Sequence, residues 1–256
     1  MNPIIIGILG ILILFILLAL RIQIGFAMAL VGFLGFMVLN SFESAIGVLG
    51  LEPFQTAASF TLSVIPLFLL MGQFANHSNM GTDVYEMVYR WIGFLPGGLA
   101  MATVGACAFF AAISGSSLAT AAMFGMVALP EMKKLEYSDA LATGCISAGG
   151  TLGILIPPSS VLILYCILTE QSIARLFIAG MVPGVLLALI FILTIYVQTK
   201  INPSIGRPGP KFSNKEKITS LKNTWGLLLL FIAVIGGLYM GIFTPTEAAG
   251  VGAFGA

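Results

Sequence analysis

Long apolar stretches alternate with short polar ones along the chain, a pattern typical of helices that cross a lipid bilayer. A transmembrane helix requires about 20 consecutive, mainly apolar residues. Arg21 and Gln23 separate the first two apolar runs, which are therefore expected to form a helical hairpin. Residues 40–53 carry Glu43 and Glu52 and are expected to form a loop. The pattern predicts membrane spans over residues 4–20, 24–39, 54–74, 140–168, 176–198 and 225–243.

Two apolar segments are interrupted near their centres. Residues 96–132 are rich in Gly, Ala, Ser and Thr, and the polar run 114–117 divides them into flanks of about 15 residues, or roughly 22 Å each. Flanks of this length hardly cross the bilayer, so the segment is expected to be a re-entrant hairpin. Residues 140–168 are interrupted at 156–159, where two adjacent prolines lack the N–H donor that an α-helix needs. This segment is predicted to be a broken transmembrane helix with an unwound centre.

The remaining segments complete a predicted division of the chain. Residues 1–75 are expected to form N-terminal transmembrane helices. Residues 76–95, which mix charged and aromatic side chains, are expected to form an interfacial helix. Residues 199–223 are expected to be a basic cytoplasmic loop. Residues 225–256 would contain the last span and an apolar stretch of only 13 residues that begins another, so the chain is expected to be truncated or a fragment.

Composition and charge exclude several classes of protein. Hydrophobic residues make up 59% of the 256 residues and charged residues only 8%, against about 25% charged in an ordinary soluble domain. A soluble protein of this size could not bury so much apolar surface. The formal net charge of +1 excludes a nucleic acid as partner, because that binding depends on clustered Lys and Arg. Cys107, Cys145 and Cys166 lack metal-ligand spacing. The expected fold class is an all-α polytopic membrane protein.

The basic residues indicate the orientation, because cytoplasmic loops carry an excess of Lys and Arg. The predicted spans place ten of the eleven basic residues on one side of the membrane and only Arg175 on the other. That side is expected to be the cytoplasm, so the N-terminus faces outward. The basic run 200–222 fits a plain cytoplasmic loop, with a lipid-binding basic patch as the alternative. The ten residues are Arg21, Arg90, Lys133, Lys134, Lys200, Arg207, Lys211, Lys215, Lys217 and Lys222.

The two breaks carry the predicted chemistry. Within hydrocarbon every backbone N–H and C=O needs a partner, so irregular backbone persists only where protein or a water-filled cavity surrounds it. In secondary transporters, carbonyls at the C-terminus of a half-helix bind a cation, and amides at an N-terminus bind an anionic group. Neutral oxygen donors without a nearby carboxylate favour Na⁺ over Ca²⁺ and over a proton relay. The alternative, close packing of small residues, requires neither adjacent prolines nor a polar turn.

The hydroxyls and exposed carbonyls at the breaks define the predicted site, and no residue is predicted to be catalytic. The Na⁺ site is predicted to consist of Ser114, Ser117, Gly149, Gly150, Thr151, Gly153, Ile156 and Pro158. The substrate-binding residues are predicted to be Ser116, Ser117, Thr120, Pro158 and Ser159.

Several motifs resemble one family, the tripartite ATP-independent periplasmic (TRAP) transporters, and in particular their large membrane subunit, the permease. Residues 112–117 (AISGSS), continuing through Ala119 and Thr120 to residues 130–132 (PEM), resemble that family's hairpin motif. Residues 149–153 (GGTLG) with 156–159 (IPPS) are similar to its broken helix. Further similar motifs are residues 179–184 (AGMVPG), 241–249 (GIFTPTEAA) and 21–26 (RIQIGF), the last with Gln23 where the family usually has proline.

The resemblance implies a function and an architecture. Such subunits take up organic acids, for example C4-dicarboxylates or sialic acid, by an elevator motion coupled to Na⁺. They work in the bacterial inner membrane, with the N-terminus here expected on the periplasmic side. Their partners are a small membrane subunit and a soluble periplasmic substrate-binding protein. The large subunit carries two inverted repeats, of which this chain would contain the first and the opening of the second.

Three other functions stay open at this point. A single-component Na⁺/carboxylate transporter of related architecture would work without a periplasmic partner. An intramembrane serine protease would pair Ser116 with His77, although His77 is predicted at the interface and Ser116 near the midplane. A non-transporting membrane scaffold would show no cation effect.

Overall fold

The computed structural model describes residues 3–256, and every regular element in that range is helical. The chain separates into two units, Met1–Leu62 and Ser63–Ala256. This boundary falls inside the segment 1–75 that the sequence assigned to N-terminal transmembrane helices. Residues 1 and 2 of that segment lie outside the described part of the chain.

The first unit consists of α1 (Pro3–Ala19), α2 (Ile24–Leu39) and α3 (Phe42–Ala57). The predicted hairpin is confirmed, since α1 packs against α2. The turn between them places Arg21 at φ 63° and Gln23 at φ −57°. A φ near −65° is the value that proline fixes, so Gln23 has a backbone φ that proline could also adopt.

The prediction of a loop over residues 40–53 is wrong, because α3 occupies most of it. The hydroxyl of Ser41 accepts a hydrogen bond from the Ser44 N–H at 3.2 Å and caps the helix. Glu43 lies in the first turn, where a carboxylate is favoured by the helix dipole. The two acidic residues suggested a loop, but their positions suit a helix. The predicted span 54–74 is divided accordingly, since α3 ends at Ala57 and the next helix begins at Val64.

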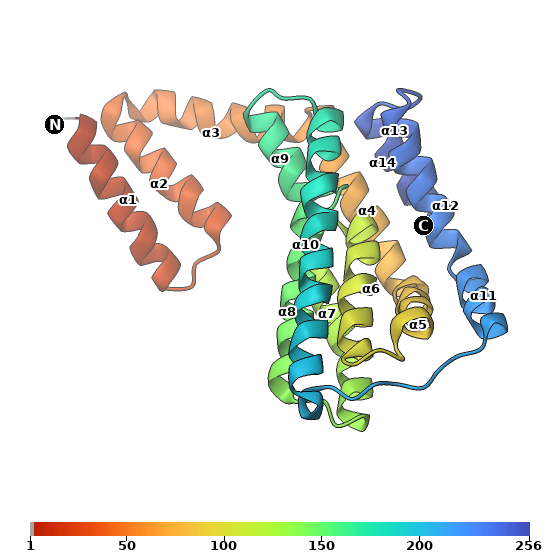
Figure 1. Cartoon of the computed structure of the whole chain (residues 1–256). Coiled ribbons are helices and arrows are strands. Elements are labelled where there is room, and N and C mark those ends of the chain that lie inside the picture. Colours follow the sequence, from red (N-terminus) through yellow and green to blue (C-terminus); the bar gives the residue numbers. More distant parts are fainter. Residues whose placement is uncertain (1–2) are drawn as a thin grey trace. The chain divides into compact units, whose positions relative to one another are not determined.

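The second unit is built around one central helix, α6 (Figure 1). Every residue of α6 except Ala108 and Phe109 is buried, and the helix contacts α4, α5, α7, α8 and α10. The helices of this unit are α4 (Val64–His77), α5 (Met80–Ile92), α6 (Gly98–Ser114), α7 (Ser117–Lys134), α8 (Asp139–Leu155), α9 (Ser160–Leu168), α10 (Ile173–Ile201), the 3-10 helix η1 (Pro203–Ile205), α11 (Asn214–Asn223), α12 (Trp225–Phe231), the π-helix η2 (Ile232–Gly236), α13 (Gly237–Tyr239) and α14 (Pro245–Gly255).

The central position of α6 follows from its small side chains. Eight of the 17 residues in its sequence, GLAMATVGACAFFAAIS, are Gly or Ala, which let neighbouring backbones approach closely. A Cβ on Gly149 of α8 would lie 2.8 Å from the sulfur of Cys107, so α6 and α8 leave no room for a side chain there. Phe110 of α6 faces α7, where it makes an edge-to-face contact with Phe124, with ring centroids 5.7 Å apart.

Two helical segments are long and apolar enough to cross a membrane by length and composition, namely Asp139–Leu168, which comprises α8 and α9, and Ile173–Ile201, which is α10. A third becomes available if α11 and the helix Trp225–Tyr239 count as one bent span. The shorter helices α1, α2, α4 and α6 are apolar but contain only 14 to 17 residues each, below the 20 or so that a straight crossing needs. The chain is thus an all-α membrane protein.

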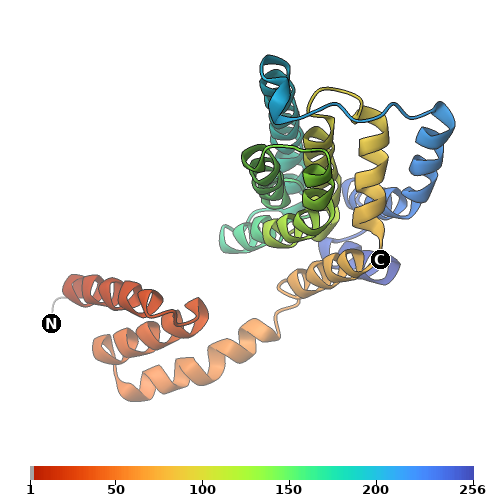
Figure 2. The same cartoon turned by 90° about the horizontal axis from the view of Figure 1, so that it is seen from below.

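The predicted basic loop 199–223 is only partly irregular, because its second half forms α11. Residues 202–213, here called the strap, connect α10 to α11 and pass the loop between α5 and α6 (Figure 2). Gly97 N–H donates to the carbonyl of Gly206 at 3.1 Å, and Gly209 N–H donates to the carbonyl of Gly93 at 2.8 Å. The strap therefore holds one end of the second unit together by backbone hydrogen bonds.

The strap also gathers basic residues at this end. Arg207 forms an ion pair with Glu136 at 2.6 Å, after the end of α7 where Lys133 and Lys134 lie. Lys200 lies at the end of α10, and Arg175 lies in the first turn of the same helix. The 25 helical steps from Arg175 to Lys200 span roughly 37 Å, so these two basic residues occupy opposite ends of a membrane-length helix, as predicted. Which end faces the cytoplasm stays a prediction.

We expect Tyr137→Phe to loosen the strap. The Tyr137 hydroxyl accepts from the Leu99 N–H at 3.2 Å and donates to the Arg207 carbonyl at 2.7 Å. Burial raises its pKa to about 12, so it remains a donor near neutral pH. Removing it leaves both groups without this partner and should cost about 1–3 kcal/mol of unfolding free energy. Thermal unfolding of the full-length protein in detergent measures this loss.

Tyr165→Phe is the matched control, because Tyr165 is 55% exposed on α9. It should leave the unfolding midpoint unchanged. Equal midpoints for the two variants would show that the Tyr137 hydroxyl does not hold the strap.

Candidate cation and substrate site

The turn between α6 and α7 is two residues long, Gly115 and Ser116. Gly115 has φ 57° and ψ 14°, the left-handed conformation that glycine adopts without strain and that ends many helices. Its N–H donates to the carbonyl of Ala111 at 3.1 Å. Ser116 is extended, and its hydroxyl accepts from the Ala119 N–H at 3.4 Å, which caps α7. The predicted break at residues 114–117 is confirmed and is narrower than expected.

The break between α8 and α9 covers residues 156–159, as predicted. Its consequence follows from the helix hydrogen-bond rule, in which the carbonyl of residue i accepts from the N–H of residue i+4. The partners of Gly153 and Ile154 would be Pro157 and Pro158, and neither proline has an N–H. The two carbonyls at the end of α8 are therefore left without helical donors.

The two breaks meet in space. Ser160, at the start of α9, donates to the carbonyl of Gly115 from its N–H at 3.5 Å and from its hydroxyl at 3.2 Å. A Cβ on Gly115 would lie 2.7 Å from the carbonyl oxygen of Pro158, and one on Gly153 would lie 2.8 Å from the backbone of Ser116. Two helix C-termini and two helix N-termini thus converge within backbone contact.

Hydroxyl groups line this junction. The Thr120 hydroxyl donates to the carbonyl of Ser116 at 2.9 Å, so it accepts from the hydroxyl of Ser114 at 2.8 Å. Ser114 and Thr120 are both buried. The hydroxyl oxygen of Ser117 is also buried but has no hydrogen-bond partner among residues 3–256. Ser117 therefore presents an unused oxygen ligand beside the turn.

The structure places the other predicted residues on different sides of this junction. Ser159 is fully buried and caps α9 by accepting from the Leu162 N–H at 3.5 Å. Gly150 faces α7, where a Cβ would lie 3.3 Å from the Ser117 carbonyl oxygen. Gly149 faces Cys107 in the middle of α6 instead. Thr151 is exposed, and its hydroxyl donates back to Ala148 at 2.6 Å.

The backbone carbonyls of α8 differ from the expectation. Because α8 is regular up to Leu155, the carbonyls of Gly149, Gly150 and Thr151 are each opposite an N–H of their own helix. The sequence predicts that these three carbonyls are exposed, and that prediction is wrong because each has a partner within the helix. Gly153 is the predicted glycine whose carbonyl lacks a helical donor. The sequence contained this signal, since the position of the prolines alone fixes which carbonyls lose their partners.

Some residues at the junction were not predicted. A Cβ on Gly72 of α4 would lie 2.8 Å from the carbonyl oxygen of Ser114, so α4 covers the end of α6. Gly184 of α10 covers Ile156 in the same way, because a Cβ on Gly184 would lie 2.7 Å from the Ile156 side chain. Asn76 lies one turn after Gly72, and its buried amide oxygen has no hydrogen-bond partner in the described part of the chain. These contacts come from helices distant in sequence, so the local pattern did not reveal them.

The electrostatics of the junction come from backbone dipoles. The C-termini of α6 and α8 carry partial negative charge, and the N-termini of α7 and α9 carry partial positive charge. No group of three or more His, Cys, Asp or Glu side chains suited to a metal ion occurs in residues 3–256. A small monovalent cation bound by neutral oxygens and an anion bound by amides both match this arrangement.

The serine–histidine pair of a protease is not assembled. The ring Nδ1 of His77 lies 2.9 Å from the carbonyl oxygen of Gln73, within its own helix. The Ser116 hydroxyl is engaged in capping α7. No hydrogen bond joins the two side chains in the described range.

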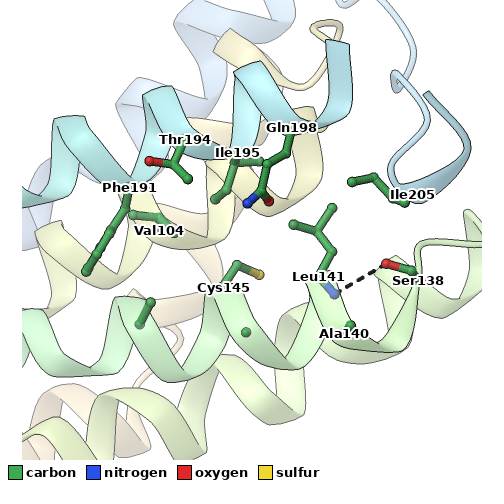
Figure 3. Close-up of a pocket in the computed structure, with 12 residues that line it drawn as sticks. Val104, Ser138, Ala140, Leu141, Cys145, Phe191, Thr194, Ile195, Gln198 and Ile205 are labelled. Atoms are coloured by element: carbon green, nitrogen blue, oxygen red, sulfur yellow. Dashed lines mark hydrogen bonds between the residues drawn. The ribbon is translucent and has the colours of Figure 1, made fainter. Parts of the chain in front are cut away.

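A separate cavity of about 420 Å³ lies between α6, α8 and α10. Figure 3 shows residues of α10 and α8 facing each other across it, among them Gln198, Thr194 and Cys145. None of the predicted Na⁺ or substrate residues lines this cavity. It is distinct from the junction of the two breaks.

The sequence matches the family model described as "Tripartite ATP-independent periplasmic transporter, DctM component" over residues 11–256. It is 43% identical over 208 residues to the C4-dicarboxylate TRAP transporter large permease protein DctM of Pseudomonas aeruginosa, covering 80% of this chain and 48% of that protein. It is 36% identical over 260 residues to the protein of the same name from Rhodobacter capsulatus, covering 95% and 57%.

A third relative is the sialic acid TRAP transporter large permease protein SiaM of Vibrio cholerae, with 32% identity over 228 residues, covering 89% of this chain and 52% of that protein. The chain spans about half the length of the curated relatives it matches. The relatives are named as permeases, which are not enzymes.

Gly153→Ala should push the two breaks apart. Its Cβ would lie 2.8 Å from the carbonyl carbon and oxygen of Ser116. Both are backbone atoms that cannot rotate away, so overpacking should cost about 1–3 kcal/mol of unfolding free energy. The measurement is thermal unfolding of the full-length protein in detergent.

The control is Gly144→Ala on the same helix, where a Cβ meets no atom within 4 Å. It should stabilise the protein by about 0.5–1 kcal/mol through helix propensity. If both variants are equally stable, the contact between Gly153 and Ser116 is absent in the protein.

Proposed function

The chain belongs to the DctM family of tripartite ATP-independent periplasmic transporters, and we propose that it forms part of a large permease subunit that takes up organic acids by Na⁺-coupled elevator transport. The observation that carries this proposal is the meeting of the two breaks at Gly115 and Pro158. A site made of four helix ends suits simultaneous binding of a cation and an anion.

Na⁺ binds on the side of the helix C-termini. Its ligands are the carbonyl of Gly153, which has no helical donor, the carbonyls at the end of α6 and the hydroxyl of Ser117. The buried and unpartnered state of the Ser117 oxygen supports this assignment, because a buried polar group without a partner is costly unless something binds it. Ser114 and Thr120 hold the turn in the shape that presents these oxygens.

The substrate carboxylate binds on the side of the helix N-termini. Ser116 and Ser159 cap the N-termini of α7 and α9, so the first turns of both helices point their N–H groups toward the same region. The Ser160 N–H donates to the Gly115 carbonyl, and those of Ala119 and Leu162 donate to the caps, so the substrate uses the remaining N–H groups of these turns. Leu118 is 84% exposed, which leaves the start of α7 open to an incoming solute. Cation and anion then share one low-dielectric site, and each offsets part of the desolvation cost of the other.

The movement carries α6 to α9 together. Contacts from Gly115 to Pro158 and from Gly153 to Ser116 join the hairpin to the broken helix through backbone atoms. Sliding this body exposes the junction to one side of the membrane and then to the other. The hairpin is re-entrant in this proposal, and the charged helix α5 lies in the interface.

The proposed setting is the bacterial inner membrane, with the strap at the cytoplasmic side and the N-terminus in the periplasm. The partners are a small membrane subunit and a periplasmic binding protein that delivers the organic acid. The relatives named for C4-dicarboxylates are 43% and 36% identical to this chain and the one named for sialic acid is 32% identical, and the chain spans about half of each, so we propose the class of substrate and not one compound.

Uptake by the full-length permease should require both a Na⁺ gradient and the binding protein. The test uses proteoliposomes containing the permease and its small subunit, with radiolabelled succinate and sialic acid supplied in parallel. Replacing external Na⁺ with choline should abolish uptake, as should omission of the binding protein. Uptake without the binding protein would favour a single-component carboxylate transporter, and uptake in choline would remove Na⁺ coupling.

Ser117→Ala should raise the Na⁺ concentration for half-maximal uptake by roughly fivefold, since it removes one oxygen ligand whose net contribution is on the order of 1 kcal/mol. Maximal uptake at saturating Na⁺ should change little. Ser147→Ala on the exposed face of α8 is the control and should behave as wild type. The same Na⁺ dependence in both variants would place the cation elsewhere.

A further inference from the structure

The short helix α11 and the apolar helical segment that follows it point in different directions. α11 and the segment Trp225–Tyr239 are inclined to each other by 53°. A capping box begins α11, with the Ser213 N–H donating to the Glu216 carboxylate at 2.7 Å and the Glu216 N–H donating to the Ser213 hydroxyl at 3.3 Å. A charged helix that is inclined to the apolar segment after it can lie along a membrane surface while that segment enters the bilayer.

One side of α11 is held against α5. The Arg90 guanidinium donates to the carbonyl of Glu216 at 3.4 Å. The ammonium of Lys217 lies 6.0 Å from the ring centroid of Trp91 and 5.5 Å from that of Phe94. Ser220 is buried on this side. These contacts fix which side of the helix faces away from the protein.

The opposite side exposes apolar side chains at helical spacing. Ile218 is 54% exposed, Leu221 is 41% exposed and Trp225 is 65% exposed. Intervals of three and four residues place Ile218 and Leu221 on one side of α11 together with Lys215 and Lys222, and Trp225 is the first residue of α12, directly after the bend. We call these five residues the α11 face. Tryptophan beside aliphatic residues and lysines is typical of the boundary between headgroups and acyl chains.

The lysines near this face have no acidic partner. Lys211, Lys215 and Lys222 are exposed and form no ion pair within residues 3–256. By contrast, Lys134 pairs with Glu131 at 2.6 Å. Glu216 is the one acidic residue of α11, and its carboxylate accepts hydrogen bonds from Ser213 at the start of the helix, which lowers its pKa. It is therefore not an ion-pair partner of these lysines.

We propose that the α11 face binds anionic phospholipid headgroups, with Lys215 and Lys222 at the phosphates and Ile218, Leu221 and Trp225 inserted beneath them. Charge complementarity carries the choice of partner, because anionic lipids give the membrane a negative surface that attracts basic helices. The core of a protein interface is depleted in lysine, which disfavours a protein as the occupant. The inference depends on membrane residence and not on Na⁺ coupling.

Photo-crosslinking of the full-length permease tests this binding. The protein is reconstituted in phosphatidylcholine vesicles containing a minority of phosphatidylglycerol, with a trace of photoreactive phosphatidylglycerol or photoreactive phosphatidylcholine. Peptide mass spectrometry then locates the crosslinks. Residues 211–225 should be labelled severalfold more by the phosphatidylglycerol probe. Lys215→Gln with Lys222→Gln should remove this severalfold preference and lower the phosphatidylglycerol labelling to the level of the phosphatidylcholine probe, with the phosphatidylcholine labelling unchanged.

Lys133→Gln with Lys134→Gln is the matched control, because it removes two basic residues at the end of α7. It should leave the labelling of residues 211–225 unchanged. Unchanged phosphatidylcholine labelling of α10 in every variant confirms that the protein is folded. Equal labelling by the two probes would overturn the proposal, and so would labelling that survives the loss of Lys215 and Lys222. Protection of the segment from both probes by the small subunit would assign the face to a protein and overturn it equally.

Discussion

The structure depends on backbone groups that have lost their helical partners inside an apolar interior. Pro157 and Pro158 leave two carbonyls at the end of α8 without donors. Gly115 ends α6, and the two-residue turn Gly115–Ser116 separates it from α7. Such groups are tolerated in a membrane only where other polar groups or a ligand meet them. The chain brings the two breaks together, so Ser160 at the second break supplies donors to the Gly115 carbonyl at the first.

Small side chains make this meeting possible. Gly72, Gly115, Gly153 and Gly184 each stand where a Cβ would lie less than 3 Å from another segment. Four helices can therefore approach the junction without a large side chain between them. The same packing explains why α6 is almost fully buried, although it is neither long nor strongly amphipathic.

The sequence predicted those features that depend on local chemistry. Both breaks, the first hairpin and the membrane class follow from prolines, polar turns and apolar runs, and the structure confirms them. The loop predicted over residues 40–53 failed because charges were taken as signs of a loop, whereas Ser41 caps a helix there. α11 was missed for the same reason. Gly72 and Asn76 could not be found, since their positions depend on how distant helices pack. Ligand roles at the junction remain predictions.

The unequal lengths of the helices in the second unit have a consequence for the surrounding lipid. Between its two terminal basic residues α10 extends for roughly 37 Å, whereas α4, with 14 residues, extends for about 21 Å. The hydrocarbon layer is about 30 Å thick. α10 must tilt or raise its ends out of that layer, and α4 is too short to reach both of its surfaces. Helices longer and shorter than the hydrocarbon layer therefore belong to the same unit, and wherever both meet lipid, the bilayer has to adjust its thickness or the longer helix has to tilt.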